Sequence, residues 1–139
     1  MKYSENCVFV VEDDHSMRNA LNNLLRSAGL CPQLFASAEE FLDANRPALP
    51  SCLVLDVRLP GLGGFDLQRE LLAQNEHIPI IFITAHGDTP MAVRAVEAGA
   101  VAFLKKPFSD QDLLEAIEVS LTLDATRIER YMGDSHNDC

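Results

Sequence analysis

The chain has 139 residues, of which 47% are hydrophobic and 23% are charged, so it can bury the core of one globular domain and is too short for two. Its 11 basic and 21 acidic side chains give a formal net charge of −10, so most of the surface should repel nucleic acid phosphates and anionic membranes. Direct binding of nucleic acid by this segment is therefore not expected.

The apolar runs of the chain are strand-sized and far shorter than a segment that crosses a bilayer. The first residues, MKYSENCVFVVEDD, place three acidic side chains directly after a short apolar run and contain no small-residue cleavage site. This segment therefore does not resemble a signal peptide, and we expect a cytoplasmic protein.

Four cysteines are scattered along the chain, with no C-x-x-C pair and no histidine at metal-ligand spacing. Three of them, Cys7, Cys31 and Cys52, lie in or beside apolar runs, where a free cysteine packs as a small hydrophobic side chain. We predict that these and Cys139 are reduced and structural, and a disulfide or metal site is the less favoured alternative.

Five short apolar, β-rich runs predict strands at residues 7–11, 31–35, 52–56, 78–84 and 101–104. The runs are nearly continuous in hydrophobicity, which is typical of strands covered by helices on both faces. The intervening segments are amphipathic, so the pattern predicts a doubly wound (βα)5 α/β domain with a parallel five-stranded sheet.

Each intervening segment carries signals of a helix start or end. These signals are the stop at Gly29, the capping pair Ser37 and Glu40, Gly63 with Gly64, Asp88 or Thr89 before Pro90, and the cap Ser109. From about residue 122 the chain becomes polar, so we divide it into a domain of residues 1–122 and a tail of residues 123–139. The tail is interpreted as a frayed helix end or the start of a linker.

Chemically reactive residues follow four of the predicted strands. They are Glu12, Asp13 and Asp14 after the first strand, Asp56 at the end of the third, Thr84 at the end of the fourth, and Lys105, Lys106 and Pro107 after the fifth. Ligands of open parallel sheets bind at the carboxyl ends of the strands, so these residues should converge on one rim. Crowded carboxylates favour a hard divalent cation, with Mg²⁺ the best fit, although solvated loop acids remain the alternative.

Asp56 closes the apolar run CLVLD, where a carboxylate must find a partner or solvent. A carboxylate can accept a phosphoryl group if the donor is held in line, a metal bridges the oxygens and positive charge lies opposite. Lys106 and the Thr84 hydroxyl could supply the remaining contacts. Taken singly, the first would be an ordinary surface lysine and the second an ordinary strand residue.

Four motifs stand in the order VVEDD, LDVRLPGLGG, FITAHGD and FLKKPF. With these motifs about 120 residues of the chain resemble the receiver domain of two-component response regulators, which has a flavodoxin-like fold. The stretch from residue 84 to 108 is similar to the FixJ-like group of transcriptional regulators, in which a receiver precedes a helix-turn-helix domain. We therefore expect these residues to be the receiver portion of a longer DNA-binding regulator.

The resemblance implies a phosphoacceptor at Asp56 and a Mg²⁺ site formed by Asp13, Asp56 and the main-chain carbonyl of Arg58, with Glu12 acting through a water molecule. Many receivers carry aspartate at the Glu12 position, but glutamate is also common there. The family lysine precedes a proline, which selects Lys106, and their peptide bond is typically cis. Asp14 is left without a role.

Thr84 and Phe103 match the switch residues of the family. The resemblance implies that phosphorylation pulls Thr84 inward and lets Phe103 rotate, which re-forms the face of the fourth helix, fifth strand and fifth helix. The implied partners are a sensor histidine kinase docking beside the first helix and a second receiver on the output face. DNA would be reached only through an output domain, and no membrane contact is implied.

Three alternative functions can be compared with that of a receiver. A phosphatase with an aspartate nucleophile needs a second acid two residues after Asp56, where Arg58 stands, so catalytic turnover beyond slow self-hydrolysis is not expected. A flavodoxin-like cofactor module is disfavoured because the acids after the first strand would repel its phosphate. A receiver-like scaffold that binds partners without phosphorylation is the principal alternative.

Overall fold

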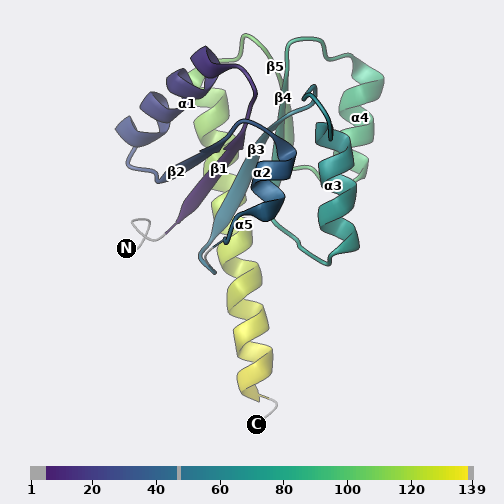
Figure 1. The fold of residues 1–139 in the computed structure, drawn as a ribbon. Coiled ribbons are helices and arrows are strands. Elements are labelled where there is room, and N and C mark those ends of the chain that lie inside the picture. The colour runs from purple at the N-terminus through teal and green to yellow at the C-terminus, as the bar shows by residue number, and fades with distance from the viewer. Residues whose placement is uncertain (1–5, 47, 138–139) are drawn as a thin grey trace.

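The computed structural model describes residues 6–46 and 48–137, and this part of the chain alternates strands and helices as predicted (Figure 1). The elements are β1 (Cys7–Val11), α1 (His15–Ser27), β2 (Pro32–Phe35), α2 (Ala38–Asp43), β3 (Ser51–Asp56), α3 (Gly64–Ala73), β4 (Ile80–Thr84), α4 (Thr89–Glu97), β5 (Ala102–Lys105) and α5 (Asp110–Asn137). Strand β4 begins two residues later than expected. Pro79 precedes it and has no N–H to donate to a neighbouring strand.

The strands form one parallel sheet in the order β2-β1-β3-β4-β5, which confirms the doubly wound topology. The order reverses between β1 and β3, and Val11 at the end of β1 lies beside Leu55 near the end of β3. The segments that leave these two strands therefore emerge side by side at the switch point of the sheet.

Helices cover both faces of the sheet. Leu21 and Ile117 bring α1 and α5 onto one face, whereas Phe41, Leu67 and Ala95 bring α2, α3 and α4 onto the other. All residues of β1, β3 and β4 are buried, as their continuous apolar runs predict. The edge strands β2 and β5 are more exposed, because each has a neighbour on only one side.

Four of the helix starts have side-chain caps. The capping oxygens belong to Asp14 for α1, Ser37 for α2, Asp88 for α4 and Ser109 for α5, and each accepts a backbone N–H three residues later. The predicted starts at Ser37, Asp88 and Ser109 are thereby confirmed. Within the described residues no helix is long and apolar enough to span a membrane.

Helix α5 is longer than the sequence predicted. It continues to Asn137, and its last turns extend beyond the sheet (Figure 1), so residue 122 is not the end of the helix. Asp124, in the segment interpreted as a polar tail, is buried and accepts the Ser51 N–H at 2.8 Å. Arg127 donates to the same carboxylate at 2.7 Å. The division into a domain and a tail at residue 122 stays a prediction.

The described cysteines are free, but their environments differ. Cys7 and Cys52 are buried, as expected, whereas Cys31 is exposed and does not pack in the core. Cys139 lies outside the described residues. Burial raises the pKa of the thiols of Cys7 and Cys52, with smaller contributions from Cys31 and Asp124, so both thiols stay protonated near neutral pH.

We expect a thiol reagent to modify Cys31 in the folded protein and to reach Cys7 and Cys52 only after unfolding, because the thiolate is the reactive form. Intact mass of the Cys139→Ser protein, with and without denaturant, measures this. Removing Cys31 as well should abolish labelling of the folded protein. Labelling of more than one site before unfolding would contradict the burial of the other two thiols.

Asp124→Ala should lower the free energy of unfolding by about 1–3 kcal/mol, because the buried Ser51 N–H loses its acceptor. Asp124→Asn retains an acceptor oxygen and should cost less. Urea denaturation measures both, with Glu118→Ala, at an exposed position of α5, as the matched control. Equal stability of the alanine variant and the control would contradict this role.

Candidate functional site

An acidic cluster lies at the carboxyl ends of β1 and β3. One carboxylate oxygen from each of Glu12, Asp13 and Asp56 lies within 4.8 Å of the others. The cause is the parallel register of the two strands, which places the residue after Val11 beside the last residues of β3. The sequence predicted that these three acids would converge, and the structure brings them together.

The three acids differ in burial. Glu12 is 1% exposed and Asp56 is 6% exposed, whereas Asp13 is exposed. Burial raises the pKa of the Glu12 carboxyl group, and the nearby Asp56 acts in the same direction. Hydrogen bonds from Lys106 and from the Asp14 N–H oppose this rise. Positive charge at the cluster therefore stabilises its ionised form.

Lys106 supplies a positive charge directly to the cluster. Its Nζ lies 2.7 Å from Oε1 of Glu12 and 3.3 Å from Oδ2 of Asp56. Desolvation lowers the pKa of this lysine, but the two carboxylates outweigh it and raise the pKa overall. The Lys106–Pro107 peptide bond is cis, as the resemblance implied. Lys105, in contrast, is exposed at the end of β5.

Thr84 lies at the end of β4 and is fully buried. Its hydroxyl oxygen accepts the His86 N–H at 3.2 Å, and its carbonyl accepts the Lys106 N–H at 2.7 Å. The second bond places the lysine backbone next to the threonine. Phe103 of β5 is half-buried, with its ring centroid 6.4 Å from that of Phe82.

The segment after β3 folds tightly around Asp56. The Arg58 N–H donates to Oδ1 of Asp56 at 3.1 Å, whereas the Arg58 side chain is exposed. Helix α3 begins close by, and a Cβ on Gly64 would lie 2.5 Å from the carbonyl oxygen of Asp56. Glycine is therefore required where α3 meets the end of β3.

The sequence analysis missed two residues that support the acidic turn. Nη1 of Arg18 donates to the carbonyl oxygens of Glu12 at 2.8 Å and Asp13 at 3.0 Å. Asp14 caps α1 with its side chain, and its N–H donates to Oε2 of Glu12 at 3.1 Å. An acidic residue before a helix is a recognisable cap, but the sequence contains no signal for the bonds of Arg18.

The donor set fits a hard divalent cation. Three carboxylates approach one another, and the single ammonium group of Lys106 leaves them with a formal excess of negative charge. Carboxylate and carbonyl oxygens are the ligands that Mg²⁺ prefers in proteins. Cation binding is therefore chemically suited to this cluster.

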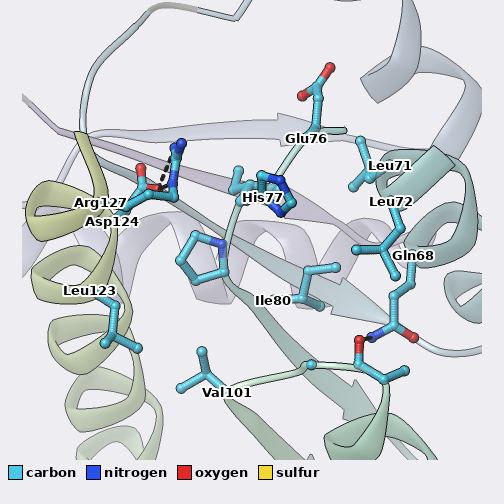
Figure 2. Close-up of a pocket in the computed structure, with 14 residues that line it drawn as sticks. Gln68, Leu71, Leu72, Glu76, His77, Ile80, Val101, Leu123, Asp124 and Arg127 are labelled. Carbon is cyan, nitrogen blue, oxygen red and sulfur yellow. Dashed lines mark hydrogen bonds and ion pairs between the residues drawn. The ribbon is translucent and has the colours of Figure 1, made fainter. Parts of the chain in front are cut away.

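The cavity in Figure 2 is a different place. It has a volume of about 290 Å³ and lies beside the amino ends of β4 and β5, with Leu72 of α3 and Leu123 and Arg127 of α5 in its lining. Glu12 and Asp56 stand at the carboxyl ends of their strands and do not line it. The acidic cluster therefore lies outside this cavity, at the opposite ends of the strands.

A family model described as the response regulator receiver domain matches residues 8–118. Nodulation protein W of Bradyrhizobium diazoefficiens is 60% identical over 122 residues, which cover 88% of this chain and 54% of that protein. The transcriptional regulatory protein FixJ of the same organism is 46% identical over 114 residues, covering 82% of this chain and 56% of that protein. The chain spans about half the length of the curated relatives it matches.

Solved structures show the same architecture. The response regulator StyR matches with a TM-score of 0.89 and 52% identity, covering 95% of this chain and 67% of that chain. Full-length FixJ from B. japonicum matches with a TM-score of 0.79 and 42% identity, covering 92% of this chain and 64% of that chain. The sheet order, the family match and these relatives agree, so the chain belongs to the response regulator receiver domains of two-component systems.

Proposed function

We propose that this receiver domain accepts a phosphoryl group on Asp56 and passes the change to its output face. The observation that carries the proposal is the meeting of Asp56 with two further carboxylates and with the ammonium group of Lys106. Such a site combines a nucleophile, a place for a cation and a fixed positive charge, which are the parts that phosphoryl transfer needs.

Asp13, Asp56 and the main-chain carbonyl of Arg58 would hold Mg²⁺, with Glu12 acting through a water molecule. The bound cation would offset negative charge between the carboxylate and the incoming phosphoryl oxygens. The bonds of Arg18 to two carbonyl groups of the acidic turn hold this turn in place. Solvation of the exposed Asp13 leaves its carboxylate accessible to a cation.

In the proposed reaction a carboxylate oxygen of Asp56 attacks the phosphorus of a phosphohistidine. The new O–P bond forms as the P–N bond breaks, and the electron pair leaves with the imidazole nitrogen. Lys106 would donate to a phosphoryl oxygen in place of one of its present carboxylate contacts. The Thr84 hydroxyl oxygen accepts the His86 N–H, so the hydroxyl proton is not used in that bond. It would be donated to a second phosphoryl oxygen.

Movement of Thr84 toward the phosphoryl group would change the room available to Phe103 and re-form the face of α4, β5 and α5. Val93 and Val96 of α4 and Val119 of α5 are about half exposed, so this part of the molecule offers apolar area to a partner. Dimerisation through this face, or release of an output domain, is the proposed consequence. Contact with DNA would require such an output domain.

The proposed phosphodonor is a sensor histidine kinase that docks beside α1. Leu21 and Leu25 are buried in the core, whereas Leu24 is only partly buried. Leu24 also lines a cavity with Met17 and Phe108. This apolar surface adjoins the α1 end of the site, which supports docking there. Slow hydrolysis of the phosphoaspartate is the only turnover that we propose.

Incubation with acetyl phosphate and Mg²⁺ should add one phosphoryl group to the protein, and Asp56→Asn should abolish the adduct because the amide is not a nucleophile. Intact mass spectrometry measures this, with Asp43→Asn at an exposed position of α2 as the control. An adduct that persists in Asp56→Asn would mean that another residue is the phosphoacceptor. No adduct on the unmodified chain would favour the phosphorylation-independent scaffold.

Lys106→Met should slow phosphorylation about 10²–10³-fold, because a preorganised donor to the developing charge is lost. The same variant should bind Mg²⁺ more tightly, since the ammonium group no longer competes for the carboxylates of Glu12 and Asp56. Phosphorylation rates at saturating Mg²⁺ and calorimetric titration measure the two effects. The exposed neighbour, changed as Lys105→Met, should alter neither, and an unchanged rate in Lys106→Met would refute its role.

A further inference from the structure

Gly87 lies between β4 and α4, in a place with no room for a methyl group. A Cβ built on Gly87 would lie 2.7 Å from Cε1 and 3.0 Å from Cζ of Phe103, and 2.8 Å from Cγ2 of Thr84. Carbon atoms in packed interiors do not approach so closely, so a side chain at this position would force a neighbour to move.

The backbone conformation does not explain the glycine. The described glycines with a positive φ are Gly29, Gly61 and Gly99, so Gly87 has a backbone that other residues can adopt. The requirement for glycine at this position is therefore one of space, and the space is filled by the aromatic ring of Phe103 and the methyl group of Thr84.

We propose that the Phe103 ring packs directly on the Cα of Gly87. This contact positions the ring against the Thr84 methyl group. The inference rests on the proposed function, in which Thr84 and Phe103 are the switch residues, and it adds a third residue to them. Gly87 would couple the position of the ring to the loop that leads from the site into α4.

The ring, rather than the threonine, is the group that can yield. Thr84 is fully buried and is held by bonds to His86 and Lys106. Phe103 is half-buried on the edge strand β5, so its ring has solvent on one side. A methyl group at position 87 should therefore displace the ring and leave the backbone of β4 in place.

The first test labels the phenylalanines with fluorine and follows their ¹⁹F NMR signals, with Phe103→Leu identifying the signal of interest. Gly87→Ala should shift that signal most, with a smaller effect on Phe82, whose ring lies 6.4 Å away, and should leave the other phenylalanines unmoved. Gly63→Ala is the matched control, because a Cβ there meets no atom closer than 3.5 Å. An unshifted Phe103 signal in Gly87→Ala would overturn the proposal.

The second test is a double-mutant cycle on thermal stability. Gly87→Ala should lower the melting temperature by about 3–10 °C, the cost of overpacking a methyl group, and by less than half of this in the Phe103→Leu background. An equal loss in both backgrounds would assign the cost to crowding against the Thr84 methyl group instead of the ring, and would overturn the proposal.

Acetyl phosphate with Mg²⁺ separates this proposal from the function on which it rests. In the unmodified chain the Phe103 signal should move on phosphorylation, and in Gly87→Ala that response should be largely lost because the added methyl group has already displaced the ring. A full response in Gly87→Ala would overturn the proposal. If phosphorylation does not move the Phe103 signal of the unmodified chain while Gly87→Ala shifts the resting signal, packing of the ring on Gly87 is supported. The proposed switch is then contradicted.

Discussion

The rim of the sheet depends on the ion pairs that Lys106 makes with Glu12 and Asp56. Parallel strands β1 and β3 carry carboxylates to the same edge, where burial and the nearby Asp56 oppose the ionisation of Glu12 by raising its pKa. The lysine comes from beyond β5, which is separated from β3 by β4. It reaches the acids because its own N–H is bound to the carbonyl of Thr84 at the end of that intervening strand. The charge balance of the site therefore requires four neighbouring strand ends, those of β1, β3, β4 and β5, in register.

The central strand β3 ties this rim to the opposite edge of the molecule. Asp56 ends the strand at the acidic cluster, and the Ser51 N–H begins it with a bond to the buried carboxylate of Asp124. Helix α5 is thus fixed to the sheet a few residues before it extends beyond it (Figure 1). In the proposed function this helix also borders the output face, so its anchorage limits how the face can rearrange. A fixed helix favours local change in the loop before α4 and in Phe103.

The strands, the capped helix starts and the meeting of the three acids could be predicted because each leaves a local pattern in the sequence. Apolar runs identify strands, and the topological switch point brings their ends together. The burial of Asp124 could not be predicted in this way, because it depends on the amino end of β3 lying opposite this residue. From sequence alone an aspartate is expected to be an exposed surface residue. The exposure of Cys31 was missed because it precedes an edge strand rather than a covered one. The bonds of Arg18 and the crowding at Gly87 depend on distances that no spacing encodes.

The charged side chains at the rim make folding less favourable than apolar side chains at the same positions would. Three acids lie close together, two of them buried, and their partner Lys106 gives up solvent to reach them. Buried ion pairs rarely stabilise a protein relative to apolar side chains of the same volume. The cluster lies at the switch point of a sheet that is otherwise apolar. Charged groups that are retained at such a cost are typical of binding sites. The local cost to stability is the physical argument for placing the proposed phosphoacceptor site at this rim rather than at the cavity at the far edge.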